Sequence, residues 1–141
     1  MIASGELVNH ACFARYTPLF IASRNGHLEV VKFLIASGGS VNRADDYGRT
    51  PLYHASKNGY LEIVQLLIAS GGSVNQADNY GRTPLYHASR KGHLEIVQFL
   101  IASGGLVNEA GTNGSTPLYV ASRYGRLEIV QLLIASGGSV N

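Results

Sequence analysis

The sequence predicts an all-α solenoid of stacked helix–turn–helix units with protruding β-turn or hairpin loops. Three observations predict it. The hexapeptide GRTPLY fills residues 48–53 and returns at 81–86, 33 positions later. Each interval of that length contains two stretches with helical signals, and each ends in Val-Asn. A helix pair of this size cannot bury its broad apolar face alone, so neighbouring pairs must stack on one another.

The period divides the chain into a short stub and four blocks. The stub covers residues 1–9, and the blocks cover 10–42, 43–75, 76–108 and 109–141. The second and third blocks are identical at 26 of 33 positions. We therefore predict one architecture for all four blocks and a single domain over residues 1–141.

The first helix of each block carries a start signal and a stop signal. In the second block the Thr50 hydroxyl is placed to cap the helix, and Pro51 follows at the first helical position, where its missing N–H costs nothing. The helix continues through LYHASKN and is expected to end at Gly59, since glycine readily adopts the left-handed conformation that terminates helices.

The second helix follows directly in the segment YLEIVQLLIAS, residues 60–70. Leu61, Val64 and Leu67 recur at helical spacing and define its apolar face. Glu62 lies in the first turn, where a negative charge suits the helix dipole. Gly71 and the following glycine end the helix, and the polar segment SVNQADNYGR supplies turn residues that lead into the next block.

These motifs resemble the ankyrin repeat family. The resemblance rests on the period, Thr-Pro-Leu, Ala-Ser-x-x-Gly, HLEIVQFLI at 93–101 and the closing Gly-x-x-Val-Asn, and it covers all four blocks and the stub.

Two departures from the family pattern are visible. Aromatic residues replace the histidine that usually follows Thr-Pro-Leu, and Arg15 replaces a turn glycine, so the first turn is expected to be irregular. The resemblance implies a non-catalytic scaffold that binds another protein or peptide on a concave surface of turns and first helices.

The candidate partner-binding residues are those that vary between blocks while the repeat frame stays fixed. They stand before Thr-Pro-Leu and at the end of each first helix, and they form a row of cations interleaved with tyrosines. Tyrosine and arginine are favoured at interface hot spots, so the row favours an acidic partner. The predicted residues are Tyr16, Arg24, Tyr47, Arg49, Lys57, Asn58, Tyr80, Arg82, Arg90, Lys91, Arg123 and Tyr124.

Two features of the sequence weigh against the acidic-partner interpretation. Cations in the last turn of a helix oppose its dipole favourably and would be common without any ligand. Three aspartates, Asp45, Asp46 and Asp78, stand in the same turns as the cations. The four glutamates that open the second helices, by contrast, are expected to lie away from the row.

Two other function classes remain open. Tyr47, Tyr80, Arg49 and Arg82 could stack bases and neutralise phosphates in a nucleic acid, although a net charge of +2 disfavours this hypothesis. Alternatively, the chain is a designed or truncated scaffold with no natural partner. Neither end resembles a polar capping repeat, so end-to-end self-association of the chain is a variant of that hypothesis.

Metal binding and catalysis are not predicted. His54 and His87 occupy matching places, but matching positions on stacked helices lie about 8–10 Å apart, whereas two ligands of one zinc ion each lie within roughly 2.1 Å of it. We expect both histidines to be partly buried and hydrogen-bonded. Cys12 lies near His10 but lacks an identifiable third catalytic group. The sequence thus predicts no enzyme, no cofactor and no small-molecule substrate.

The remaining signals concern location. The chain has a single cysteine, no leader-like segment and no apolar run of the roughly 18 residues that a membrane span needs. These features predict an intracellular, cytoplasmic protein that does not enter a membrane.

The family also contains hydroxylated asparagines in the Val-Asn turn, which would map to Asn42, Asn75 and Asn108. The acidic residue that usually precedes the valine is absent here. We therefore expect these asparagines to hydrogen-bond the turn instead.

Overall fold

The computed structural model of the protein describes residues 16–141, in which eight helices form four consecutive pairs and no strand occurs. The stub, Cys12 and the turn at Arg15 lie outside the described residues, so the expectations about them stay predictions. Within 16–141 no helix has the length and apolar character needed to cross a membrane. The helices are α2 (Pro18–Asn25), α3 (Leu28–Ala36), α4 (Pro51–Asn58), α5 (Leu61–Ala69), α6 (Pro84–Lys91), α7 (Leu94–Ala102), α8 (Pro117–Arg123) and α9 (Leu127–Ala135).

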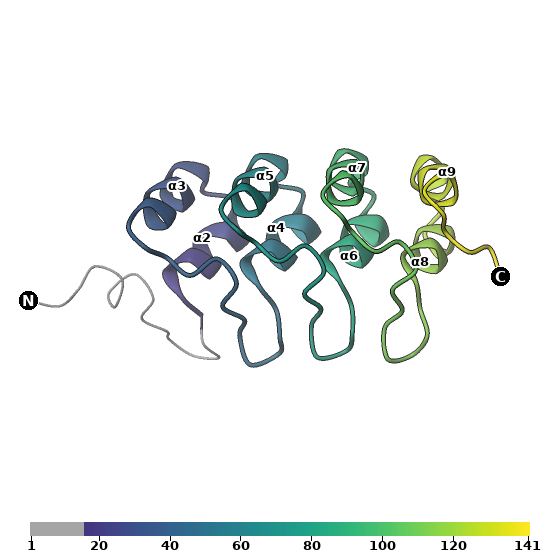
Figure 1. Ribbon diagram of the computed structural model, residues 1–141, viewed down its shortest axis with the longest axis horizontal. Coiled ribbons are helices and arrows are strands. Elements are labelled where there is room, and N and C mark those ends of the chain that lie inside the picture. Colours follow the sequence, from purple (N-terminus) through teal and green to yellow (C-terminus); the bar gives the residue numbers. More distant parts are fainter. Residues whose placement is uncertain (1–15) are drawn as a thin grey trace, which may run out of the picture.

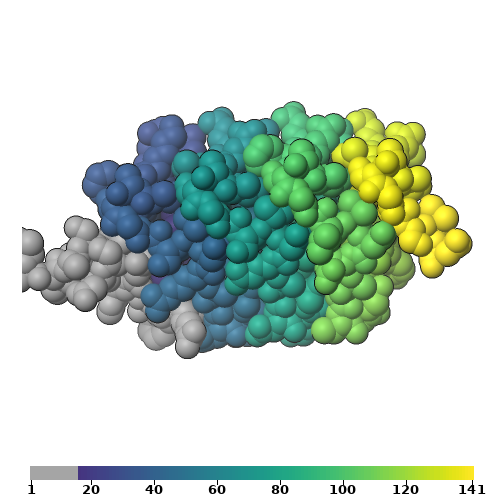
Figure 2. All heavy atoms as spheres, viewed as in Figure 1, coloured from purple at the N-terminus to yellow at the C-terminus, as the bar shows by residue number. Residues whose placement is uncertain are grey.

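The pairs stack side by side in two layers. The first helices α2, α4, α6 and α8 form one row, and the second helices α3, α5, α7 and α9 form a row above it in Figure 1. The turns that connect successive pairs project from the side opposite the second helices. Successive pairs follow one another along the long axis as bands of colour in Figure 2. This arrangement confirms the predicted all-α stack of helix pairs.

The predicted helix signals act as expected in α4. The Thr50 hydroxyl accepts a hydrogen bond from Tyr53 N at 3.1 Å, and Pro51 occupies the first helical position. Gly59 ends the helix with φ 86°, in the left-handed region. The same cap recurs in α2 and α6, whereas α8 ends at Arg123 and has Tyr124 as its C-cap, one position before the glycine.

The core runs without interruption through all four pairs. It is built from one leucine and one alanine of each first helix and from the inward face of each second helix. In α5 these inward residues are Ile63, Val64 and Leu67, which are 2% exposed or less. Fully burying one such side chain contributes about 1.5–3 kcal/mol, so most of the stability comes from packing between neighbouring pairs.

The Val-Asn asparagines join successive pairs. Asn75 Nδ2 donates to the Gly104 carbonyl at 3.1 Å, and Asn75 Oδ1 accepts from Leu106 N at 3.0 Å. Asn42 and Asn108 make the equivalent two bonds to the Gly-Gly turns that follow them. The expected hydrogen bonding is present, but it reaches the turn of the next block rather than closing the asparagine's own turn.

The residue that precedes each second helix also reaches its neighbour. His93 Nε2 donates to the Lys57 carbonyl at 3.0 Å, and Arg126 Nε donates to the Arg90 carbonyl at 3.2 Å. These bonds satisfy carbonyls at the ends of α4 and α6, which have no partner inside their helices.

Candidate protein-interaction site

The protruding turns are held in shape by buried aspartates. Asp45 is 5% exposed, and its Oδ1 accepts hydrogen bonds from Tyr47 N and Arg49 N, each at 2.9 Å. Asp78 is 9% exposed and accepts from Tyr80 N and Arg82 N in the same way. Aspartate side chains commonly close turns by such bonds to the following backbone. These two carboxylates are therefore part of the turns.

Neighbouring turns are joined to each other by further hydrogen bonds. Asn79 N donates to the Tyr47 carbonyl at 2.9 Å, and Asn79 Nδ2 donates to the Asp46 carbonyl at 3.0 Å. Thr112 N donates to the Tyr80 carbonyl at 2.8 Å. The turns thus form a connected row, so side chains that they carry are fixed relative to one another.

Tyrosine and arginine side chains stack along this row. The Arg49 guanidinium carbon lies 4.9 Å from the centre of the Tyr47 ring, and that of Arg82 lies 5.6 Å from the Tyr80 ring. Tyr47 and Tyr80 remain 54% and 59% exposed. A cation over an aromatic face is attractive and orients the guanidinium.

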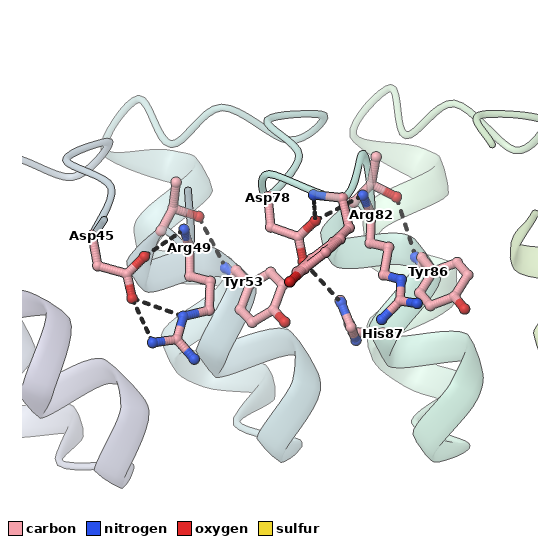
Figure 3. A network of polar contacts seen from close by, with 10 residues as sticks. Asp45, Arg49, Tyr53, Asp78, Arg82, Tyr86 and His87 are labelled. Carbon is pink, nitrogen blue, oxygen red and sulfur yellow. Dashed lines mark hydrogen bonds and ion pairs between the residues drawn. The ribbon is translucent and has the colours of Figure 1, made fainter. Parts of the chain in front are cut away.

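Arg49 differs from the other cations because its charge is already neutralised. Its Nε and Nη2 atoms each lie 2.7 Å from Asp45 Oδ2, and Nη2 also donates to the Tyr16 hydroxyl at 3.0 Å. Figure 3 shows this pair beside the second turn, in which Arg82 extends alongside Tyr86 instead of toward the Asp78 carboxylate. The ring of Tyr86 lies 5.4 Å from the Arg82 guanidinium carbon.

A second set of cations lies at the ends of the first helices. Lys57, at the end of α4, lies near enough to Arg49 on the turn for the two charges to interact. Burial, followed by the positive charges of Lys91 and Arg90, lowers the pKa of Lys57. The helix-end cations of α4 and α6 therefore lie close enough to repel one another.

Most cations on this face have no carboxylate partner. Within residues 16–141 the ion pairs are Arg49 with Asp45 and Lys32 with Glu29, plus a His87–Asp78 contact. We name the six other cations of the predicted site the cation row. The cation row consists of Arg24, Lys57, Arg82, Arg90, Lys91 and Arg123. The four glutamates of the second helices are exposed on the outer layer.

The histidines at matching places are buried among aromatic rings. His54 and His87 are 6% and 3% exposed, and the Tyr53 ring lies edge-on to both, at 5.0 and 4.5 Å. His54 Nε2 and both ring nitrogens of His87 have no hydrogen-bond partner. The expectation of hydrogen-bonded histidines is wrong at these atoms, because aromatic packing takes the place of polar partners.

The buried histidines carry no charge near neutral pH. Burial, reinforced by nearby cations, lowers the pKa of each to about 3. His87 Nε2 lies 3.7 Å from Asp78 Oδ2, which is too long for a hydrogen bond. Burial, followed by the negative charge of Asp78, raises the pKa of the neighbouring Tyr53 to about 12. No group of three or more potential metal ligands is assembled within residues 16–141.

The predicted site residues do not all have the same surroundings. Tyr16 is half-buried, and its ring stacks on Phe20 with centroids 4.9 Å apart. Asn58 Nδ2 donates to the Arg24 carbonyl at 3.0 Å, so this side chain links two repeats. Arg90 and Arg123 lie 5.5 and 5.6 Å from the ring of Tyr124.

Sequence reasoning missed the role of the aspartates. It counted Asp45 and Asp78 as charges opposing the cations, whereas each closes its own turn and only Asp45 neutralises an arginine side chain. The pattern that could have indicated turn closure is an aspartate at the third position of the second and third blocks, four residues before an arginine. Glycine replaces it in the fourth block, where Asn113 Oδ1 accepts from Ser115 N instead.

The fold and the site together define a class of protein: a helical repeat solenoid with a row of ordered turns along one side. Comparison with protein families makes the assignment more specific. The family model described as ankyrin repeats (3 copies) matches residues 2–78 and again 68–141. The chain belongs to the ankyrin repeat family. Proteins of this family generally act as protein–protein interaction modules and are typically non-enzymatic. No curated protein matches the chain closely enough to be compared with it.

Proposed function

We propose that the chain is a non-catalytic interaction scaffold that binds an acidic segment of a partner protein on the concave face formed by its protruding turns and first helices. The observation that carries the proposal is the cation row, whose six members have no carboxylate partner within residues 16–141. An acidic segment would supply the missing negative charges.

Exposed tyrosines support the same proposal. Tyr47 and Tyr80 stand beside arginines on the connected turns, more than half exposed. Such side chains offer large contact areas at a low cost in conformational entropy. The partner segment would thus meet aromatic surface at the turns and positive charge at the helix ends.

The test compares two charge-changed variants that lower the net charge by the same amount. One is Lys57→Gln/Arg90→Gln/Lys91→Gln, which removes three members of the cation row. The matched control is Gln65→Glu/Gln98→Glu/Gln131→Glu, which adds three negative charges at exposed positions of the second helices. Arg49 is left intact because its ion pair with Asp45 stabilises a turn.

Binding is measured by fluorescence anisotropy with a labelled glutamate-rich peptide of about ten residues, after circular dichroism shows equal helix content. We expect the cation-row variant to bind about tenfold more weakly than wild type, and the control to lose much less affinity. Equal weakening of both variants would indicate a net-charge effect and overturn the concave site. Tighter binding to single-stranded oligothymidine than to the peptide would favour the nucleic-acid hypothesis instead.

We propose end-to-end self-association as a second candidate, favoured by the apolar surface at the two ends of the stack. At one end Tyr119 is 56% exposed, whereas its counterparts Tyr53 and Tyr86 are 5% and 6% exposed beneath the next repeat. The ring borders a groove of about 520 Å³. At the other end Val30 and Phe33 on α3 are 50% and 71% exposed. A second copy would extend the interface that already joins successive repeats.

A further inference from the structure

Four cations and a tyrosine at the ends of the first helices form a helix-end cluster. We define it as Lys57, Arg90, Lys91, Arg123 and Tyr124. The guanidinium carbons of Arg90 and Arg123 lie 5.5 and 5.6 Å from the centre of the Tyr124 ring. The Tyr124 ring, at the end of α8, thus lies near two arginines that come from different repeats.

Lys57 and the two α6 cations of the cluster repel one another. None of the four cations of the cluster is in an ion pair within residues 16–141. The pKa of Lys57 is lowered by burial and by the charges of Lys91 and Arg90. Like charges at close range destabilise the folded chain, and departures from locally favourable chemistry are concentrated at functional sites. A bound anion would remove the repulsion.

Tyr124 adds a phenol to these charges. Its polar interaction with Arg90, followed by the positive charges of Arg90 and Arg123, lowers the pKa of the phenol. A tyrosine hydroxyl can both donate and accept a hydrogen bond. The cluster therefore combines two arginine forks, two ammonium groups and one hydroxyl.

A carboxylate and a phosphoryl group would use this cluster differently. A carboxylate carries one negative charge and two oxygens. A phosphoserine or phosphothreonine carries about −1.5 to −2 charge at pH 7 and three strong acceptor oxygens. Neighbouring cations from successive repeats, with several diverging donors, match the larger charge and the larger number of acceptors, and arginine forks suit phosphate geometry.

We propose that the helix-end cluster binds a phosphoryl group carried by the partner segment. This inference rests on the proposed concave-face function and makes it specific: the partner is a phosphorylated segment, and phosphorylation regulates its binding. The exposed Tyr47 and Tyr80 and the remaining cations would contact residues on either side of the phosphorylated position.

Nuclear magnetic resonance titration of the whole chain tests the proposal. The probes are three peptides of identical glycine-rich sequence that carry phosphoserine, serine or glutamate at the central position. We expect the phosphoserine peptide to shift the resonances of Arg90, Lys91 and Tyr124, the glutamate peptide to bind more weakly and the serine peptide not to bind. Lowering the pH from 7.5 to 5 should weaken only the phosphopeptide, because its second ionisation lies near pH 6.

The variant Lys91→Asn/Tyr124→Asn tests the cluster with little risk to the fold, because asparagine occupies the same place in the second block, at Asn58. The matched control is Lys32→Gln on α3, which also removes one positive charge and introduces the residue that the other blocks carry there. We expect about threefold to tenfold weaker phosphopeptide binding for the cluster variant, and wild-type binding for the control.

Three results would overturn the proposal: equal binding of phosphoserine and glutamate peptides, equal binding by the cluster variant and wild type, or resonance shifts confined to other surfaces. Its failure is distinguishable from failure of the proposed function. If the glutamate-rich peptide still binds through the cation row, only the phosphoryl inference is lost. If neither that peptide nor the phosphopeptide binds, both are lost.

Discussion

At the scale of single residues, His54 and His87 illustrate how burial sets the charge of a side chain. They are 6% and 3% exposed, three of their four ring nitrogens have no hydrogen-bond partner, and burial lowers the pKa of each to about 3. An imidazole in an unfolded chain has a pKa of about 6.5. As the pH falls, the unfolded chain therefore takes up protons before the folded chain does.

We predict that acid destabilises the protein through these histidines. Their contribution is fully present above about pH 6.5 and is lost as the pH falls toward 3, by up to about 1.4 kcal/mol per pH unit for each histidine. The measurement is the free energy of unfolding in urea at pH 7 and pH 5. In His54→Val/His87→Val the dependence should be flatter, since Val120 occupies the same place in the fourth block and is 2% exposed. Equal losses in both proteins would refute the assignment.

At the scale of secondary-structure elements, the glycines that follow the first helices have two roles. Gly59 has φ 86°, and a Cβ atom there would lie 2.8 Å from Cε1 of His93 in the next repeat. Gly125 has φ 69° but nothing within 4 Å of the same position. The first role, ending the helix, is local. The second, admitting the neighbour's side chain, exists only where a repeat is stacked against the glycine.

We predict that Gly59→Ala destabilises the protein more than Gly125→Ala does. Both substitutions place a side chain in the left-handed region, at a cost of about 1–2 kcal/mol. Gly59→Ala also displaces His93 and its bond to the Lys57 carbonyl, which should add about 1–3 kcal/mol. Urea denaturation of the two variants gives the difference directly. If the two variants lose the same stability, the close packing against His93 contributes nothing measurable.

At the scale of the whole molecule, stability and association follow from one repeated interface. The main contacts of each helix pair are with its neighbours, and the same asparagine bonds join every pair to the next within residues 16–141. Stability of such a stack is approximately a sum of repeat and interface contributions. The apolar surfaces at its two ends are the halves of that interface that no described helix pair covers.

We predict that the chain associates end to end and that its average mass rises with concentration in sedimentation equilibrium. Ile134→Glu should reduce the association, because Ile134 is 45% exposed and lines the groove beside Tyr119. Gln131→Glu, an equal charge change at an exposed position on the same helix, should leave the association unchanged. A wild-type mass that stays constant over the whole concentration range would exclude this mode of association.

The helices, their caps and their order follow from local sequence. These features depend on interactions between residues a few positions apart, such as Thr50 with Tyr53 N, and such spacings can be read along the chain. The 33-residue period also predicts that the helix pairs stack, because a repeated amphipathic pair can bury its apolar face only against another pair.

Which polar groups are engaged, and which remain available to a partner, depends on how the repeats stack. Several hydrogen bonds join residues 29 to 36 positions apart, so no local sequence pattern predicts them. They are the asparagine bonds, the His93 contact and the Arg49–Tyr16 bond. The same holds for charge: Arg49 and Arg82 follow identical GRTPLY contexts, yet only Arg49 forms an ion pair. This is because burial and pairing depend on what the next repeat places opposite each side chain.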